Sequence, residues 1–426
     1  MMHQDHEGVK PVPTPPRDSS APRASLDALL AFAWNAGVFV SADAMAVTGL
    51  TRSTAIDALD ELIDLGLLHE LPNARAVGEY SKGRPARRFE LRAEAAVVIG
   101  VDAGRSHVTV TVADLRGTAL GRLSVELDTD HDDPEARRSA VLDAIDRGLR
   151  EAGRDRSSVV AVCVGVPAPV DSRGHSPRHR DGFWERMNPG LKEILEEWVP
   201  IVRIENDAAL AAVAEGSTGA AIGCRDYVVL LAGDRFGAGV VIDGALLRGA
   251  HGGVGELVAL DFVAGVESAT GVGSRLTEWV REAAAAGEVP PRHPLADVPI
   301  ERLTGQAVLE LAREGDAWSR TFVERAGGML ARIAALFGSL YDPARVIVSG
   351  AVADGLDDVV DVARTRLPAE VDLPAPELVL SALGANSVAT GAVAAALESA
   401  RDRLLRLEPG ALPLIRPSAP AGPNAT

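Results

Sequence analysis

The segment Val98–Gly117, VIGVDAGRSHVTVTVADLRG, decides the class of fold. Its first residues are apolar and predict a buried strand that ends in a turn at Asp102 and Gly104. From His107 on, valines alternate with polar residues, which predicts a second strand linked to the first as a hairpin. A third strand, a helix and another buried strand follow at 118–127, 134–153 and 159–171. Strands that alternate with helices in this order predict an α/β fold.

A similar order of elements returns in the second half of the chain. It is predicted from strands at 201–205, 227–234, 238–247 and 344–352, and from helices at 207–215, 271–286, 306–341 and 388–405. Two such sets of strands and helices indicate two α/β lobes with a cleft between them.

Upstream of the first strand, the sequence pattern is helical. The predicted elements are a helix capped by Ser25, a short helix at 42–47 capped by Ser41, a turn at Gly49, a helix capped by Thr51 or Ser53 that ends at Gly66, and two strands, 67–71 and 88–91, around a loop. Two helices joined by a glycine turn and followed by two strands predict a winged helix-turn-helix.

The second helix of this motif and the wing carry the candidate DNA contacts. These are hydroxyl and arginine side chains at the helix start and two basic side chains beside Gly83, suited to phosphates, base edges and a narrow minor groove: Thr51, Arg52, Ser53, Thr54, Lys82 and Arg84. The same helix carries four carboxylates, Asp57, Asp60, Glu61 and Asp64. A protein-interaction domain with an acidic face therefore stays open as an alternative.

The composition limits the class of protein. With 426 residues, 47% of them hydrophobic, the chain is long enough for two or three domains. Its formal net charge of −17 means that any DNA contact needs a local basic patch. We expect a cytoplasmic chain without a membrane partner, because no apolar run reaches the roughly 18 residues of a membrane helix. The expected parts are disordered tails at 1–24 and 413–426, the winged helix-turn-helix at 25–93 and a second domain at 94–412.

Two motifs predict a polar site in the cleft. Asn206 and Asp207 stand where a strand meets a helix, and an aspartate there can take a proton from a hydroxyl, although this pair is also a common helix cap. Glu256 ends a glycine-rich segment, residues 247–256, that can approach a polar ligand closely. The turn at Asp102 is of the kind that admits a phosphate, but Arg105 crowds the entrance.

Taken together, these segments resemble the ROK family (repressors, open reading frames and kinases of sugars) over about residues 26–400. The motifs that carry the resemblance are LTRSTAIDALDELIDLGLL (50–68), SKGRPARRFEL (81–91), VIGVDAGRSHVTVTVADLRG (98–117), VGVPAPVD (164–171), IENDAALAAVAE (204–215), GAGVVIDGALLRGAHGGVGE (237–256) and YDPARVIVSGAV (341–352). The first two resemble the regulator branch, because the family's free-standing sugar kinases lack the N-terminal domain.

The resemblance implies a two-lobed fold of the actin and hexokinase type, a ribonuclease H-like ATPase fold. It also implies a sugar or effector site built from five polar side chains, with Asp207 at the position of the kinase base: Asn188, Asn206, Asp207, Glu256 and Glu267.

The chain departs from the family's kinases at the phosphate and zinc motifs. Arg105 and Arg235 stand at the two phosphate turns, where the family's kinases have glycine and the backbone must be bare. Ala259 replaces the family's zinc-binding histidine, and the cysteines of that loop are missing. We therefore expect no catalytic residue, no cofactor and no metal.

The first hypothesis is a non-enzymatic transcriptional regulator, of the repressor type, with an inactive kinase-like domain. It would bind a double-stranded DNA operator as a homodimer or higher homo-oligomer and would sense a sugar or sugar derivative. Two alternatives stay open: an ATP-dependent sugar kinase with an appended N-terminal domain, and a degenerate protein-interaction module.

Overall fold

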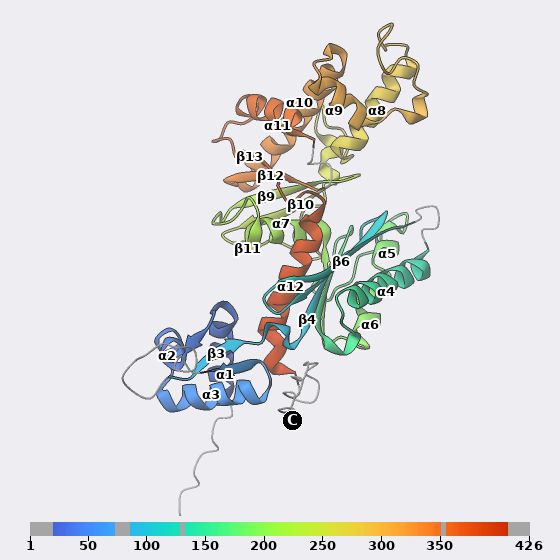
Figure 1. Ribbon diagram of the computed structural model, residues 1–426. Helices are drawn as coiled ribbons and strands as arrows, with labels where there is room; N and C mark the ends of the chain where they lie inside the picture. Colours follow the sequence, from blue (N-terminus) through green and yellow to red (C-terminus); the bar gives the residue numbers. More distant parts are fainter. Residues whose placement is uncertain (1–19, 73–85, 128–132, 351–354, 408–426) are drawn as a thin grey trace, which may run out of the picture. The chain divides into compact units, whose positions relative to one another are not determined.

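The computed structural model describes residues 20–72, 86–127, 133–350 and 355–407. The chain divides into two compact units, Met1–Arg92 (unit 1) and Ala93–Thr426 (unit 2). Both units are drawn in Figure 1. In the described ranges, no helix is both long and apolar enough to cross a membrane.

Unit 1 is built from three helices and a small antiparallel sheet. Its elements are α1 (Ser20–Asn35), β1 (Phe39–Val40), α2 (Ser41–Thr48), α3 (Arg52–Asp64), β2 (Leu68–Leu71) and β3 (Arg88–Leu91), with strand order β1-β3-β2. The core is apolar and fully buried, and it contains Leu29 and Leu30 of α1, Leu59 and Leu62 of α3, and Phe89 of β3. This is the predicted winged helix-turn-helix order, with one extra short strand.

The structure corrects two helix starts in unit 1. Helix α1 begins at Ser20, so Ser25 lies inside the helix, and residues 20–24 of the expected tail belong to α1, while residues 1–19 lie outside the described residues. Helix α2 begins at Ser41 itself, and the carboxylate of Asp43 accepts from the backbone N–H of Val40 at 2.9 Å in place of a serine cap. The turn at Gly49, with φ 70°, has the left-handed conformation that was expected there.

The first lobe of unit 2 carries a five-stranded mixed sheet. Its strands are β4 (Val97–Asp102), β5 (His107–Asp114), β6 (Ala119–Glu126), β7 (Val159–Val166) and β8 (Ile201–Asn206), in the order β6-β5-β4-β7-β8. The hairpins β4–β5 and β5–β6 are antiparallel, and β7 and β8 add in parallel. Helix α4 (Pro134–Glu151) packs its apolar side chains against this sheet. Two short helices that were not predicted come later in the chain, α5 (Phe183–Met187) and α6 (Leu191–Glu196).

The second lobe repeats the plan with a sheet of order β11-β10-β9-β12-β13. The strands are β9 (Tyr227–Ala232), β10 (Phe236–Ile242), β11 (Ala245–Leu246), β12 (Arg345–Ser349) and β13 (Glu377–Leu380). The helices that gather beyond this sheet are α8 (Val272–Ala285), α9 (Gly305–Arg313), α10 (Ala317–Tyr341) and α11 (Asp357–Arg366). The helical region expected at 306–341 is therefore two helices, because Asp316 caps α10 after a turn at Gly315.

Two helices join the lobes: α7 (Asp207–Thr218) and α12 (Ser387–Arg403) lie between the two sheets (Figure 1). Three glycines let the layers approach closely. A Cβ at Gly100 of β4 would lie 2.5 Å from a backbone nitrogen of α12, and side chains at Gly391 of α12 and Gly239 of β10 would overlap backbone oxygens of α7. The lobes thus share one tightly packed hinge, and the predicted two-lobed α/β fold is confirmed.

Candidate functional site

The start of α3 presents the predicted DNA contacts of the helix. Thr51 is the N-cap, and its hydroxyl accepts from the backbone N–H of Thr54 at 3.4 Å and lies 2.9 Å from the Thr54 hydroxyl. Arg52 and Ser53 are exposed, whereas Thr54 is half-buried. The Thr51 hydroxyl is therefore engaged in the cap and also lies 3.2 Å from the Ser53 hydroxyl, while Arg52 extends to solvent at a helix N-terminus, which attracts phosphate.

Arg87 joins the base of the predicted wing to α3. Its guanidinium lies 2.8 Å from a carboxylate oxygen of Asp60 on α3 and donates to Glu70 of β2 at 2.9 Å. It also covers the ring of Phe89 at 5.0 Å from the centroid. Part of the negative charge of the acidic helix is thereby balanced inside unit 1.

Three other basic residues lie in or beside the predicted wing. Arg92 is buried and donates to the carbonyl of Gly66 at 2.9 Å, so it supports the fold and does not face a ligand. Lys82 and Arg84 lie outside the described residues.

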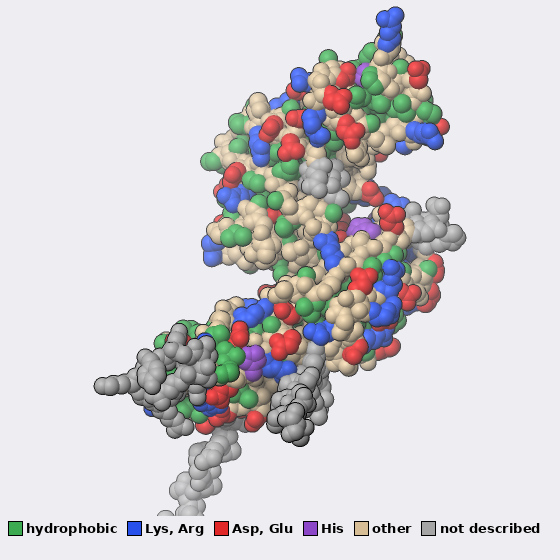
Figure 2. Space-filling model, viewed as in Figure 1, with side chains coloured by type: hydrophobic (Ala, Val, Ile, Leu, Met, Phe, Trp, Pro, Cys, Tyr) green, Lys and Arg blue, Asp and Glu red, His purple; other side chains and the backbone are tan. Residues whose placement is uncertain are grey.

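In unit 2, three carboxylates come together from distant parts of the chain. Asp102 ends β4, Asp207 begins α7, and Glu256 follows a sharp turn at Gly255, whose φ is 92°. Burial, with the charge of Asp102, raises the pKa of the Asp207 carboxyl to about 7. Burial also raises the pKa of Glu256, which Arg235 and His179 oppose. Figure 2 shows the surface of unit 2 hollowed between its lobes.

His107 covers the turn after β4. Its Nε2 lies 3.1 Å from Oδ2 of Asp102, and this hydrogen bond raises the pKa of the histidine. The imidazole rests on Gly104, because a Cβ at that glycine would lie 2.8 Å from Nδ1 of His107. The histidine therefore fills the space over the turn that was predicted to admit a phosphate, and it engages the aspartate of that turn.

A buried arginine holds the same turn from inside the lobe. Arg137 of α4 donates to the carbonyls of Ala103 at 2.5 Å and Gly104 at 3.1 Å, and to the carbonyl of Met187 at 3.1 Å. Such charge-assisted bonds from a buried guanidinium are strong and fix the backbone. The turn is thus fixed by a cation on one side and covered by an imidazole on the other.

Asn206 serves as the helix cap that the sequence left open. Its side-chain oxygen accepts from the backbone N–H of Ala209 at 3.0 Å, and its amide donates to the carbonyl of Ala168 at 3.2 Å. Asp207, the next residue, accepts from the N–H of Ala208 at 2.7 Å. Asn206 therefore ties α7 to the loop after β7, while Asp207 belongs to the carboxylate group.

The glycine-rich segment 247–256 is fastened to the first lobe. Arg248 donates to the buried carboxylate of Glu205 at 2.9 Å, and Arg203 donates to the same carboxylate oxygen at 2.9 Å. A side chain at Gly252 would overlap the backbone of Val170, so the segment lies directly on the loop after β7. Glu256, at the end of this segment, is close enough to Asp207 for its charge to raise the pKa of that carboxyl.

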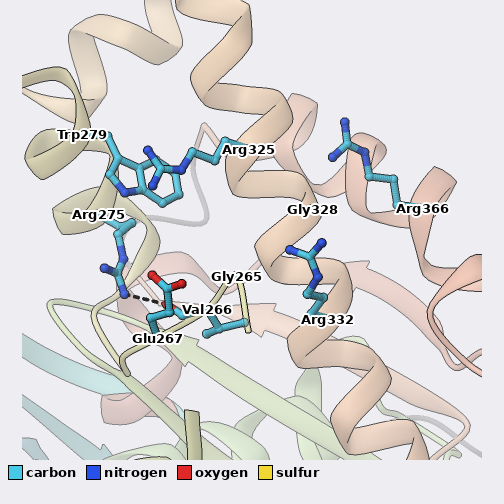
Figure 3. A pocket seen from close by; sticks show the side chains of 9 residues that line it. All are labelled: Gly265, Val266, Glu267, Arg275, Trp279, Arg325, Gly328, Arg332 and Arg366. Carbon is cyan, nitrogen blue, oxygen red and sulfur yellow. Dashed lines mark hydrogen bonds between the residues drawn. The ribbon is translucent and has the colours of Figure 1, made fainter. Parts of the chain in front are cut away.

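Two predicted site residues lie in other surroundings. Asn188 is buried and donates to the carbonyl of Gly174 at 3.0 Å and to the Ser176 hydroxyl at 3.1 Å. Glu267, with φ 65°, lines a pocket of about 240 Å³ among arginines of the second lobe (Figure 3). The lining of that pocket includes none of Asn188, Asn206, Asp207 and Glu256.

The two arginines expected at the phosphate turns are exposed. The backbone of Arg235 pairs with Thr270, and its charge opposes the rise in the pKa of Glu256, so it belongs to the surroundings of the carboxylates. Arg105 is beside the covered turn, but the residue that fills the turn is His107.

The shortened loop that lacks the zinc ligands is only partly packed into the core. Leu260 is fully buried in the core of the second lobe, whereas Val258 and Phe262 are 56% and 88% exposed. Within the described ranges, no three His, Cys, Asp or Glu side chains are grouped so that they could hold a metal ion.

Sequence reasoning missed His107 and Arg137 as parts of the site. The hairpin register could have indicated His107: Asp102 pairs with Thr109, so a residue two positions before Thr109 shares the face of Asp102 and lies diagonally opposite. No comparable signal exists for Arg137, which reaches the turn from a helix more than thirty residues away.

Comparisons with known proteins place the chain in a family. The model of the ROK family matches residues 98–399. The DNA-binding transcriptional dual regulator NagC of Escherichia coli (strain K12) is 24% identical over 317 residues, 72% of this chain and 73% of that protein. A glucokinase of Streptomyces coelicolor is 29% identical over 289 residues, 63% of this chain and 86% of that protein.

The fold of almost the whole chain is also found in a solved structure. The crystal structure of a ROK family transcriptional regulator, a homolog of the E. coli MLC protein, has a TM-score of 0.72 at 20% identity and covers 91% of this chain and 98% of that one. At this identity the likeness concerns the fold. Since the family model spans most of unit 2, the chain belongs to the ROK family.

Proposed function

We propose that this chain is a DNA-binding transcriptional regulator, of the repressor type, whose ROK domain binds a sugar or sugar derivative without phosphorylating it. One observation carries the proposal: a single chain joins a helix-turn-helix unit with an exposed recognition-helix start to a ROK domain. The relative NagC, a DNA-binding transcriptional regulator by name, supports it.

On the DNA side, Arg52 and Ser53 at the start of α3 are the base and phosphate contacts, with Thr51 and Thr54 shaping that turn. Lys82 and Arg84 of the wing add phosphate or minor-groove contacts. The chain acts in the cytoplasm as a homodimer or higher homo-oligomer, because two-fold operators match two-fold proteins.

On the effector side, Asp207, Glu256 and Asn206 are the polar groups that receive sugar hydroxyls. Asn188, whose amide is bonded to Gly174 and Ser176, and Glu267, which lines the separate pocket among arginines, do not join this set. Carboxylates and amides in a hollow between lobes suit vicinal hydroxyls. Binding draws the lobes together about the α7–α12 hinge, which shifts the population between two arrangements of the helix-turn-helix units in the oligomer.

The absence of phosphoryl transfer rests on the covered turn. ROK-type kinases would need the Asp102 turn open to phosphate and metal, whereas here His107 engages Asp102 and lies on Gly104. Arg137 fixes the carbonyls of that turn, so the turn cannot easily rearrange.

An electrophoretic mobility shift with the DNA upstream of the chain's own gene, at moderate salt, tests the regulator function. We expect a specific complex that weakens at least tenfold in Arg52→Gln, since a charged contact to a base or phosphate is lost. The matched control is Arg150→Gln, the same change at an exposed arginine of α4. Absence of any specific complex would count against DNA binding.

A sugar kinase is the second candidate, favoured by the 29% identity to a glucokinase and by an aspartate whose pKa of about 7 suits a general base. Coupled measurement of ATP turnover over a panel of hexoses and N-acetylhexosamines separates the two. We expect binding of a sugar by calorimetry without turnover. Steady turnover that is lost in Asp207→Asn would establish the kinase instead.

A further inference from the structure

A pocket of about 240 Å³ lies between α8, α10 and α11 and is lined by four arginines (Figure 3). Arg275 comes from α8, Arg325 and Arg332 from α10, and Arg366 from α11. Trp279 and Glu267 also line it. In a chain with a net charge of −17, this concentration of positive charge is local and demands an explanation.

The fold makes room for these guanidinium groups. Gly265 lies under Arg332, because a Cβ there would be 3.1 Å from the guanidinium carbon. Gly328 likewise lies against Arg366, because a Cβ at Gly328 would be 2.7 Å from Nη1 of Arg366. Larger residues at either glycine would displace an arginine from the pocket wall.

The other two arginines are oriented by the pocket itself. Arg325 stacks on the ring of Trp279 at 3.9 Å from the centroid, which holds a planar cation at low entropic cost. Arg275 donates to the carbonyl of Val266 at 3.0 Å and to the Ser268 hydroxyl, while its Nε is buried with no hydrogen-bond partner. A buried donor without a partner is costly and indicates that an acceptor is missing.

Three of the four arginines pair with a glutamate that stands outside the pocket lining. Glu278 and Glu370 approach Arg275 and Arg332 only to 3.8 Å, and Glu324 bonds Arg366. None of these three glutamates lines the pocket, whereas Glu267 does, with its carboxylate on the side of Arg275 (Figure 3). By its lining side chains alone, the pocket carries four positive charges and one negative charge. Among the described residues, Arg325 is the pocket arginine without an ion pair.

We propose that this pocket binds a small phosphate ester, at a site separate from the carboxylates around Asp207. Guanidinium groups from three helices approach from different directions, which suits the tetrahedral oxygens of a phosphate better than the planar carboxylate. The volume of the cavity is several times the roughly 30 Å³ that a water molecule occupies, so the cavity has room for more than the phosphate group. The carboxylate of Glu267 is placed to accept from a hydroxyl of the organic part.

Calorimetric titration of the full chain tests the site, with glycerol 3-phosphate as the probe, citrate as the carboxylate comparison and glycerol as the uncharged control. We expect glycerol 3-phosphate to bind, and Arg325→Gln and Arg332→Gln each to weaken its affinity at least tenfold. Both arginines are exposed at the surface, so the variants are expected to fold. The matched control is Arg313→Gln, an exposed arginine of α9 outside the pocket.

Two further variants locate the site. Asp207→Asn and Arg235→Gln are expected to leave binding of glycerol 3-phosphate within twofold of the wild type, whatever they do to sugar binding. Three results would overturn the proposal: no binding at millimolar glycerol 3-phosphate, full affinity in both pocket variants, or loss of binding in Arg235→Gln instead. Tighter binding of citrate would overturn the assignment to phosphate esters.

Discussion

The free energy of unfolding of Asp207→Asn, measured relative to the wild type, should be higher above pH 7 than at pH 5. The carboxyl group has a pKa of about 7 in the folded chain, against 3.8 as its ordinary value. Because the folded pKa is the higher one, folding favours the protonated form, and this favourable contribution is complete below pH 3.8 and is lost as the pH rises to about 7. Asparagine keeps the shape and can accept from the N–H of Ala208 as the aspartate does.

The magnitude follows from the two pKa values. Each pH unit between them removes about 1.4 kcal/mol from the free energy of unfolding, so the loss between pH 5 and pH 8 is about 2.6 kcal/mol. Because Asp207 is half-buried, access of water lowers this figure, and we expect about 1 to 2 kcal/mol. The difference between Asp207→Asn and the wild type should therefore widen by that amount over this range and stay constant above pH 8.

Urea unfolding at pH 5, 6, 7 and 8, followed by tryptophan fluorescence, measures the difference. Four of the five tryptophans lie in unit 2: Trp184, Trp198, Trp279 and Trp318. The control is Asp143→Asn, which removes an exposed carboxylate of α4 and should change stability by less than about 0.5 kcal/mol at every pH. A difference for Asp207→Asn that does not vary with pH would refute the reasoning from burial.

Three further predictions concern the hinge, the recognition helix and the thiols. Gly391→Val should lower the free energy of unfolding by about 2 kcal/mol or more in urea titrations, because the new side chain meets the backbone of α7. Gly253→Ala, with open space around the glycine, should change this free energy little. Equal effects of the two variants would contradict the close packing. Thr51→Ala should destabilise unit 1 by about 1 kcal/mol, because α3 loses its N-cap, and amide hydrogen exchange in α3 should become faster. Thr51→Ser should restore the protection against exchange. Unchanged exchange in Thr51→Ala would contradict the cap. Cys163 is fully buried, and burial raises its pKa to about 12, so a thiol reagent should modify Cys224 first in the native chain; faster reaction at Cys163 would show that the core opens there.

Local patterns in the sequence predicted most of the elements. The glycines at 49 and 66 and the cap at Thr51 marked the helix-turn-helix, since turns and caps depend on a few neighbouring residues. The start of α1 was placed too late because Ser20 to Pro22 resemble the preceding proline-rich tail, although the first turn of a helix tolerates proline. The short strand β13, with four residues, was not predicted from the sequence.

The candidate site was predictable only in part. Asp207 and Glu256 were chosen from their motifs, and the fold brings them together with Asp102. Glu267 was chosen in the same way, but the fold places it among the arginines of the second lobe. A motif indicates the type of side chain and its element, whereas its neighbours come from elements that lie far away in the chain.

By itself, the sequence determined the order of a winged helix-turn-helix followed by a two-lobed α/β domain, because hydrophobic periodicity, caps and glycine turns act over a few residues. Its motifs also carried the resemblance to the ROK family. Only the tertiary structure decided that His107 covers the Asp102 turn, that Arg137 fixes it, and that four arginines from three helices share one pocket. These contacts join residues through strand register and helix packing, which depend on the whole fold and leave no local pattern to recognise.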